Sequence, residues 1–328
     1  KQDVMTNFVS KFVMLQYFSQ SSFLLIVVVI SIILRMNSVV TAQVSQGINC
    51  FWILITWGIG WYIMPSASQR RTVPEGSHVL IVGFTQTFHT MKLVGTKFKK
   101  GMLWFFLAVI FAEAGANAFT VVSVTFMSEV LKMDGTEVAI IFIVTLVASL
   151  PGAVLAEFVT KKTDPNKSWQ LCLVVFAIVT VAGGLLLTDE SQKNLIYLFG
   201  VLWGVILGWF YPTENLFFSM VLPKGAETEL AGFYIYCTQI LVWAPPLIFT
   251  AINESGAHMK WGLMSLIIFF GIALVFLRMV SPWDEVVKEA ETPISNFGID
   301  EIDGNIELEE GVNDARETKE DEFHVSSS

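Results

Sequence analysis

Runs of about 20 apolar residues recur along this chain and constrain its fold more than any other feature. A helix needs about 20 predominantly apolar residues to cross the hydrocarbon core of a bilayer. Within that core, a helix satisfies its backbone hydrogen bonds internally. We therefore predict an all-α polytopic membrane protein with about eight spans, at residues 18–36, 46–65, 102–126, 137–157, 169–188, 195–221, 230–252 and 260–280.

The composition supports a membrane location and argues against a nucleic-acid-binding protein. Charged residues make up 15% of the chain, against about 25% in an average soluble domain. The net charge of −9 arises from the end of the chain, because residues 281–328 hold fifteen acids and three bases. No basic surface for a nucleic acid is evident. We expect the lipid bilayer and a small-molecule substrate as partners.

Motifs for enzyme chemistry are missing from the sequence. Cys50, Cys172 and Cys237 lie in or beside apolar runs without paired spacing, which argues against a disulfide framework and against a metal site. The four histidines are scattered. The sequence also lacks the common zinc-protease, phosphate-loop, nucleophile-elbow and dinucleotide motifs. We therefore expect no enzyme activity, no cofactor and no bound metal.

Positive charges between the spans indicate the orientation, because cytoplasmic loops carry an excess of Lys and Arg. The loops on one side carry only Arg35, Lys132, Lys193 and Lys260. The other side, which includes both ends of the chain, carries Lys1, Lys11, Arg70, Arg71, Lys92, Lys97, Lys99, Lys100, Lys161, Lys162, Lys167 and Lys224. We expect both ends to be cytoplasmic.

A long polar loop divides the spans into two and six. Its second part, from His78 to Lys100, suits either an amphipathic helix on the cytoplasmic leaflet or a solvated linker. The acidic end of the chain lacks apolar periodicity, which is typical of a disordered segment. The predicted domains are two helices in 1–65, a central loop in 66–101, a six-helix unit in 102–280 and a disordered tail in 281–328.

Glycines recur every fourth residue in the run at 195–221, at Gly200, Gly204 and Gly208. This spacing lets another membrane helix approach closely, since association in lipid depends on van der Waals packing. We therefore expect a partner helix to pack against this glycine face.

Prolines interrupt the same region of the chain. We expect Pro212 to break its helix and Pro245–Pro246 to kink the next one, because proline removes a backbone donor. A polar hinge at 223–229 separates the two runs. Prolines are tolerated at membrane depth where neighbours or a water-filled cavity satisfy the freed backbone groups. We interpret this region as a helix–hinge–helix unit that lines a polar path.

Four segments of the chain carry a family resemblance, the first of them FSMVLPKGAETELAGFYIY. This segment resembles the junction before the penultimate helix of the vacuole effluxers of autophagy, a branch of the major facilitator superfamily. The approach to its fifth helix, its sixth helix and its seventh helix are similar to FVSKFVMLQYFSQSSFLLIVVV, TWGIGWYIMPSASQ and WFFLAVIFAEAGANAF. The likeness covers about residues 5–280.

The resemblance implies the major facilitator fold, in which two six-helix halves flank a central linker. On this plan, residues 102–280 form the complete C-terminal half and residues 1–65 the last two helices of the N-terminal half. About four helices are then missing. The resemblance also implies export of amino acids, such as leucine, from the vacuole to the cytosol by alternating access.

One candidate pathway for substrate or protons starts at Glu113, because an acid inside the membrane is costly and usually faces a cavity or a partner. Asn117 and Thr120 follow at i+4 and i+7, so the three residues share one face. The alternative is a protonated Glu113 that serves helix packing. The family usually has an acid directly before the glycine of this helix, where this chain has Ala114.

A second set of polar residues lies in the helix–hinge–helix unit. The resemblance implies that the seventh and tenth helices line the central cavity, so Glu113 and Glu214 would face one path, with Tyr211 beside Glu214. The alternative for Glu214 is a carboxylate near the cytoplasmic surface. Tyr236 and Gln239, at i and i+3, either bind substrate or join helices.

A candidate cytoplasmic gate is formed by Glu157, Lys161 and Lys162. The cluster resembles a loose copy of the superfamily's gate motif between the eighth and ninth helices, which can latch two helices together. The alternative is an i,i+4 ion pair on a helix surface.

Two other functions remain open on the sequence alone. One is a plasma-membrane facilitator for another small solute, including a cationic or proton-coupled one. The other is a membrane scaffold that acts through its acidic tail without transporting anything.

Overall fold

The structure is a computed structural model that describes residues 2–34, 38–64, 79–223 and 227–291. Throughout this described part the regular elements are helices. They are α1 (Gln2–Ile33), α2 (Ser38–Ile63), α3 (Val79–Lys97), α4 (Met102–Glu129), α5 (Gly135–Lys162), α6 (Pro165–Leu186), η1 (Glu190–Gln192), α7 (Lys193–Val221), α8 (Glu227–Gln239), α9 (Ala244–Glu254), α10 (Met259–Arg278) and α11 (Trp283–Glu291).

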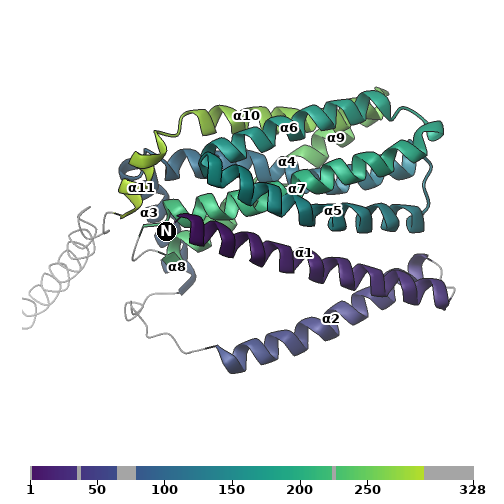
Figure 1. Ribbon diagram of the computed structural model, residues 1–328, viewed down its shortest axis with the longest axis horizontal. Coiled ribbons are helices and arrows are strands. Elements are labelled where there is room, and N and C mark those ends of the chain that lie inside the picture. Colours follow the sequence, from purple (N-terminus) through teal and green to yellow (C-terminus); the bar gives the residue numbers. More distant parts are fainter. Residues whose placement is uncertain (1, 35–37, 65–78, 224–226, 292–328) are drawn as a thin grey trace, which may run out of the picture.

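Apart from α2, the long helices run roughly parallel or antiparallel in one bundle (Figure 1). The α4, α5, α6, α7 and α10 helices pack together, and α1 lies along α5 and α7. Eight helical segments of the described chain are long and apolar enough to cross a membrane. The prediction of an all-α polytopic membrane protein is therefore confirmed.

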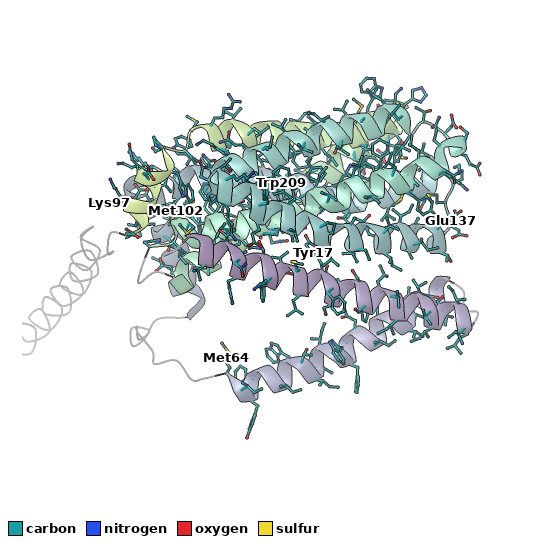
Figure 2. The ribbon with its side chains drawn as sticks, in the orientation of Figure 1. Tyr17, Met64, Lys97, Met102, Glu137 and Trp209 are labelled. Carbon is teal, nitrogen blue, oxygen red and sulfur yellow. The ribbon has the colours of Figure 1, made fainter. Side chains whose placement is uncertain are left out.

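The α2 helix diverges from the bundle (Figure 2, where Met64 marks its end). No side chain described in α2 is buried, and Trp57 and Trp61 are largely exposed. Near the start of α2, the hydroxyls of Ser31 and Thr41 lie 2.7 Å apart and join it to α1. The apolar surface of α2 suits contact with lipid or with further membrane helices.

The glycine face of α7 packs directly on α5, as its spacing predicts. A Cβ atom on Gly204 would overlap the carbonyl of Thr145, and one on Gly208 would overlap the carbonyl of Ser149. The contact is reciprocal, because a Cβ on Gly152 of α5 would overlap the carbonyl of Val205 on α7. The two backbones therefore touch, and only glycine fits at these crossings.

A buried polar chain also ties α5, α6 and α7 together. The Thr160 hydroxyl donates to the Ser168 hydroxyl at 2.9 Å, and the indole N–H of Trp209 donates to the same oxygen at 3.0 Å. Each of the three side chains is buried, and Trp209 lies inside the bundle (Figure 2). These bonds satisfy polar groups that would be costly to leave unpaired in an apolar interior.

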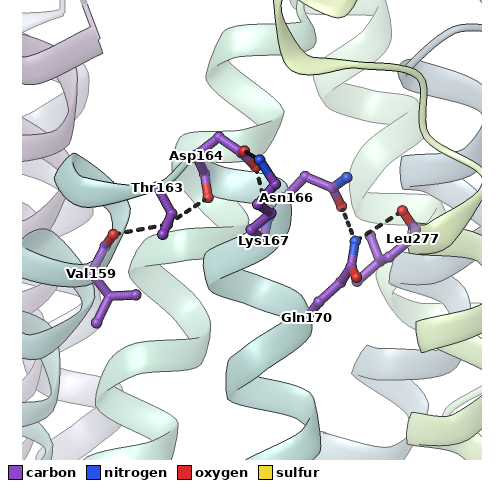
Figure 3. A network of polar contacts seen from close by, with 7 residues as sticks. All are labelled: Val159, Thr163, Asp164, Asn166, Lys167, Gln170 and Leu277. Carbon is purple, nitrogen blue, oxygen red and sulfur yellow. Dashed lines mark hydrogen bonds and ion pairs between the residues drawn. The ribbon is translucent and has the colours of Figure 1, made fainter.

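The turn between α5 and α6 is fixed by local caps (Figure 3). The Asp164 carboxylate accepts the main-chain N–H of Lys167 at 2.8 Å and so caps α6. One turn further along, the Gln170 amide donates to the carbonyl of Leu277 on α10 at 3.1 Å. The Asp164 cap therefore fixes the start of α6, and the Gln170 side chain joins α6 to the main chain of α10.

The first helix begins much earlier than the predicted span at 18–36. Polar residues such as Asn7 and Lys11 lower the hydropathy of its first half, so a search for apolar runs misses it. One face of that half is nevertheless buried, because Val9 and Val13 pack against α5 and α7. Tertiary packing therefore extends the helix beyond its apolar segment.

Pro212 does not break its helix, contrary to the sequence expectation. The α7 helix continues through it to Val221, and Pro212 is buried within the bundle. Its ring costs one backbone hydrogen bond, to the carbonyl of Gly208. A helix packed on several sides can retain its course when neighbours hold it.

The predicted span at 230–252 is two helices separated by a turn at 240–243. Pro245 and Pro246 stand in the first turn of α9, where a missing N–H costs little. They also cannot donate to the carbonyls of Leu241 and Val242, which ends the preceding helix. The prolines therefore start a new helix rather than kink a continuous one.

The central loop contains a helix in its second part, α3. The α3 helix ends with the basic residue Lys97, and its Leu93 and Val94 are buried. It packs against α8 and α4. Its placement on a membrane leaflet stays a prediction, and residues 65–78 lie outside the described residues.

The acidic tail begins later than predicted, because α11 is a helix within the segment 281–328. Its Val286 and Ala290 are buried, and the main-chain N–H of Ser281 donates to the carbonyl of Lys100 at 2.8 Å. Two apolar residues one turn apart are enough to dock a short helix, although they leave little periodic signal. The rest of the predicted disordered tail lies outside the described residues.

Candidate functional site

Glu113 lies inside the bundle, where α4 faces its neighbours. Its side chain is 5% exposed, and the Asn117 amide, one turn further along α4, donates to its Oε2 atom at 2.7 Å. The same amide donates to the Glu113 carbonyl at 3.0 Å. Asn117 therefore fixes the rotamer of the acid, and the spacing i, i+4 makes that contact possible.

Glu214 of α7 lies directly against Glu113. Its side chain is 0% exposed, and the two carboxyl groups are within hydrogen-bonding reach of each other. The Tyr234 hydroxyl of α8 donates to Glu214 Oε1 at 2.8 Å. The structure therefore brings together two acids that are far apart in the sequence, and a third helix contacts them.

The second carboxyl oxygen of Glu214 bears on how the two acids interact. Glu214 Oε2 is buried and accepts no hydrogen bond from any ordinary donor in the described protein. Two ionised carboxylates can only accept, so they would leave this atom unpaired and repel each other. A proton held between the two acids would remove this repulsion.

Two more tyrosines surround the acid pair. Tyr17 of α1 is buried and donates to the carbonyl of Leu207 on α7 at 3.0 Å, on the side of α1 that faces the bundle (Figure 2). Tyr17 and Tyr211 lie close enough to interact electrostatically with Glu113. Together with the two acids, Asn117 and Tyr234, they form what we call the carboxyl cluster, which comprises Tyr17, Glu113, Asn117, Tyr211, Glu214 and Tyr234.

Sequence reasoning missed Tyr17 and Tyr234 as members of this cluster. A tyrosine in an apolar run is a weak signal, because its ring suits packing as well as hydrogen bonding. Tyr17 and Tyr234 are far apart along the chain, so the sequence gives no indication that both lie beside the two acids. Only the packing of α1 on α7 and of α8 on α4 places them there.

Three predicted pathway residues lie away from the carboxyl cluster. Thr120 of α4 is exposed, and so are Tyr236 and Gln239 of α8. The Gln239 amide donates to the hydroxyl of its neighbour Thr238 at 3.3 Å. These three residues do not share a site with Glu113 in this structure, and their role stays a prediction.

The candidate gate residues join α5 to α1. Glu157 Oε1 accepts from the Asn7 amide of α1 at 3.0 Å and from Lys161 Nζ at 2.6 Å. Lys162 points elsewhere, with its Nζ 4.1 Å from the centre of the Phe158 ring. Glu157 therefore makes both the local i,i+4 ion pair and a bond between two helices, whereas Lys162 contributes to neither.

A double-mutant cycle tests whether this bond holds α1 to α5. We expect Asn7→Ala and Glu157→Ala to be coupled by about 0.5–1.5 kcal/mol in the free energy of unfolding, since each removes the same partly buried bond. The measurement is unfolding of the four proteins in detergent. Asn7→Ala combined with Lys162→Ala is the matched control and should be additive. Coupling within error of zero for the first pair would contradict the assignment.

The cluster lacks the features of a metal site. In the ranges that the structure describes, no three side chains of His, Cys, Asp or Glu gather as potential metal ligands. The arrangement instead provides two adjacent carboxyls, an amide and three phenols inside a helical membrane bundle. Such a set can hold a proton or hydrogen-bond a small polar solute, and it defines a polytopic membrane protein with an internal polar site.

Comparison with known protein families identifies the family of this chain. The family model described as "Vacuole effluxer Atg22 like" matches residues 3–290. The chain therefore belongs to the Atg22-like vacuole effluxer family, which confirms the resemblance seen in the four sequence segments.

Individual relatives are distant. Autophagy-related protein 22-1 of Aspergillus clavatus is 20% identical over 270 residues, which make up 73% of this chain and 43% of that protein. Autophagy-related protein 22-2 of Aspergillus fumigatus is 22% identical over 185 residues, which make up 53% of this chain and 28% of that protein. The chain thus spans less than half the length of these relatives.

Proposed function

We propose that this protein is a transporter of the vacuolar membrane that exports amino acids, leucine among them, to the cytosol during autophagy. The observation that carries the proposal is the family match over residues 3–290. The relatives named as autophagy-related proteins support the cellular setting. The eight candidate spans support a transport path through a helical bundle.

The proposed mechanism is alternating access, in which two helical units rock about a central site. We assign the helices of residues 102–280 to one unit, and α1 and α2 to the other. The Asn7–Glu157 bond lies between these two units. A polar bond of this kind, formed in one state and broken in the other, would contribute to the balance between the two states.

The carboxyl cluster is the proposed centre of the path. It lies where helices of both units meet, because Tyr17 comes from α1 and the two acids come from α4 and α7. A buried acid pair beside several phenols is costly to maintain in a membrane protein and is usually functional. If Glu113 serves helix packing alone, Glu113→Gln should leave transport and its pH dependence unchanged.

Leucine efflux from isolated vacuoles tests the proposed function. Vacuoles from cells that contain the protein and from cells that lack its gene are loaded with labelled leucine, and release is followed over time. We expect faster release when the protein is present. Labelled glucose serves as the control solute and should leave both kinds of vacuole at the same rate.

Two outcomes would contradict the proposal. Equal leucine release from both kinds of vacuole would exclude leucine export. Location of the protein in the plasma membrane, seen by fractionation, would favour the facilitator for another solute. The scaffold alternative depends on the acidic tail beyond Glu291, which lies outside the described residues.

A further inference from the structure

The two acids of the carboxyl cluster come from different helices, α4 and α7, and their carboxyl groups contact each other. Glu113 is held by Asn117 of its own helix, and Glu214 by Tyr234 of α8. After these bonds are counted, Glu214 Oε2 is the atom left without an ordinary donor. This oxygen is part of the Glu214 carboxyl group, which contacts the carboxyl group of Glu113.

We propose that Glu113 and Glu214 form a single proton-binding site, in which one proton is shared between the two carboxyl groups and links α4 to α7. The contact favours this proton, since two ionised carboxylates within an apolar interior would repel each other. Neither of them could donate to the buried Glu214 Oε2, which has no other partner among the described residues. One proton on either acid converts the contact into a short, charge-assisted hydrogen bond. The occupied site then carries one negative charge.

The groups that face the pair support a net charge of minus one rather than zero. They are the hydroxyls of Tyr17, Tyr211 and Tyr234 from α1, α7 and α8, the amide of Asn117 from α4 and, beside Tyr17, the thiol of Cys172 from α6. Tyr234 and Asn117 donate to the acids, and donation favours a carboxylate over a neutral acid. None of these groups is a cation, so none replaces the shared proton.

Burial selects a proton over a larger ligand in this conformation. The side chains of Glu113 and Glu214 are 5% and 0% exposed, so an amino acid cannot reach both carboxyl groups without a movement of the surrounding helices. A proton can occupy the contact as it stands. The site therefore differs from a substrate pocket in the state that the structure shows.

Loss of the proton is expected to loosen the bundle at this point. When the site opens, the shared proton passes to water, the charge of the pair changes from −1 to −2, and the contact between α4 and α7 becomes repulsive. Tyr234 connects the change to α8, which ends at the turn before Pro245 and Pro246. A short helix beside a turn can move more easily than the continuous α7. The use of this proton in a transport cycle rests on the proposed function, whereas its presence does not.

Infrared spectroscopy of the purified 328-residue chain in lipid nanodiscs tests the site without any transport assay. Protonated carboxyl groups have a distinct C=O stretching band, and ordinary exposed acids are ionised at neutral pH. We expect the wild type to retain such a band at neutral pH. Glu113→Gln and Glu214→Gln should each lose it, because the glutamine amide can donate to the remaining carboxylate and no proton is needed. Glu254→Gln, at an exposed acid at the end of α9, should retain the band.

Each result decides the proposal. Absence of the band from the wild type at neutral pH would overturn it, even if the variants fail to fold. A band that survives Glu113→Gln would show that Glu214 holds a proton by itself, which would overturn the sharing. If leucine export fails while the band behaves as expected, the proposed function is wrong but the proton site stands.

Hydrogen exchange tests the mechanical consequence. At a pH high enough to remove the infrared band from the wild type, amides of α8 and of α4 around Glu113 should exchange several-fold faster than those of Glu113→Gln at the same pH. At acidic pH the two proteins should exchange alike. Equal protection at both pH values would overturn the link between the proton and helix packing.

Discussion

Gly208→Ala is expected to lower the free energy of unfolding by about 1–3 kcal/mol, the usual cost of overpacking a tight contact. The added methyl group would overlap the carbonyl of Ser149. A backbone atom cannot change rotamer to make room, so α5 and α7 must move apart along their shared face. The measurement is thermal or denaturant unfolding of the purified chain, followed by tryptophan fluorescence in detergent.

Gly271→Ala is the matched control for this change. Gly271 lies in the apolar helix α10, and a Cβ atom there has nothing within 4 Å. Alanine favours a helix over glycine by up to about 1 kcal/mol, so this variant should be neutral or slightly stabilised. Ser149→Ala should not rescue Gly208→Ala, since the obstacle is the main chain. Equal effects at Gly208 and Gly271 would contradict the close packing of α5 and α7.

Glu113→Gln is expected to reduce leucine efflux by about tenfold or more and to remove its dependence on pH. Glutamine cannot take up or release a proton, so the variant cannot use the shared proton to change between two states. A shift of that equilibrium by about 1.4 kcal/mol changes a population about tenfold. Glutamine has nearly the shape of glutamate and can bond to both Asn117 and Glu214, so folding should be preserved. The measurement is efflux from vacuoles at several pH values, with protein amounts matched.

The control for the charge itself is Glu254→Gln, which removes an exposed acid at the end of α9 and should leave efflux and its pH profile unchanged. An unaltered pH profile in Glu113→Gln would assign that residue to helix packing. So would a lower protein yield with normal efflux per molecule, since an unpaired buried polar group costs stability.

The features that depend on a short stretch of sequence were predictable. The eight apolar runs gave the number of spans, because crossing a bilayer depends mainly on local length and composition. The repeat of Gly200, Gly204 and Gly208 indicated a close helix contact, and its face does meet α5. The start of α1 and the docking of α11 were not predicted, because their stability comes from partners elsewhere in the chain.

The carboxyl cluster shows how far a sequence can lead to a site. Glu113 and Glu214 stood out individually, because acids are rare inside apolar runs. Tyr236 was chosen on α8, whereas Tyr234 makes the bond to Glu214. Two residues apart on a helix correspond to a rotation of about 200°, so these tyrosines point to nearly opposite sides. The sequence of α8 carries too weak an apolar pattern to show which side faces inward.

The sequence by itself determined the class of protein, the candidate spans of the described chain and its family, because hydropathy and local motifs add up along the chain. The tertiary structure decided which polar groups meet. Contact between Glu113 and Glu214 requires that α4 and α7 have matching depth and rotation. Both depend on how every helix in the bundle packs against its neighbours, and no local stretch of sequence specifies that packing.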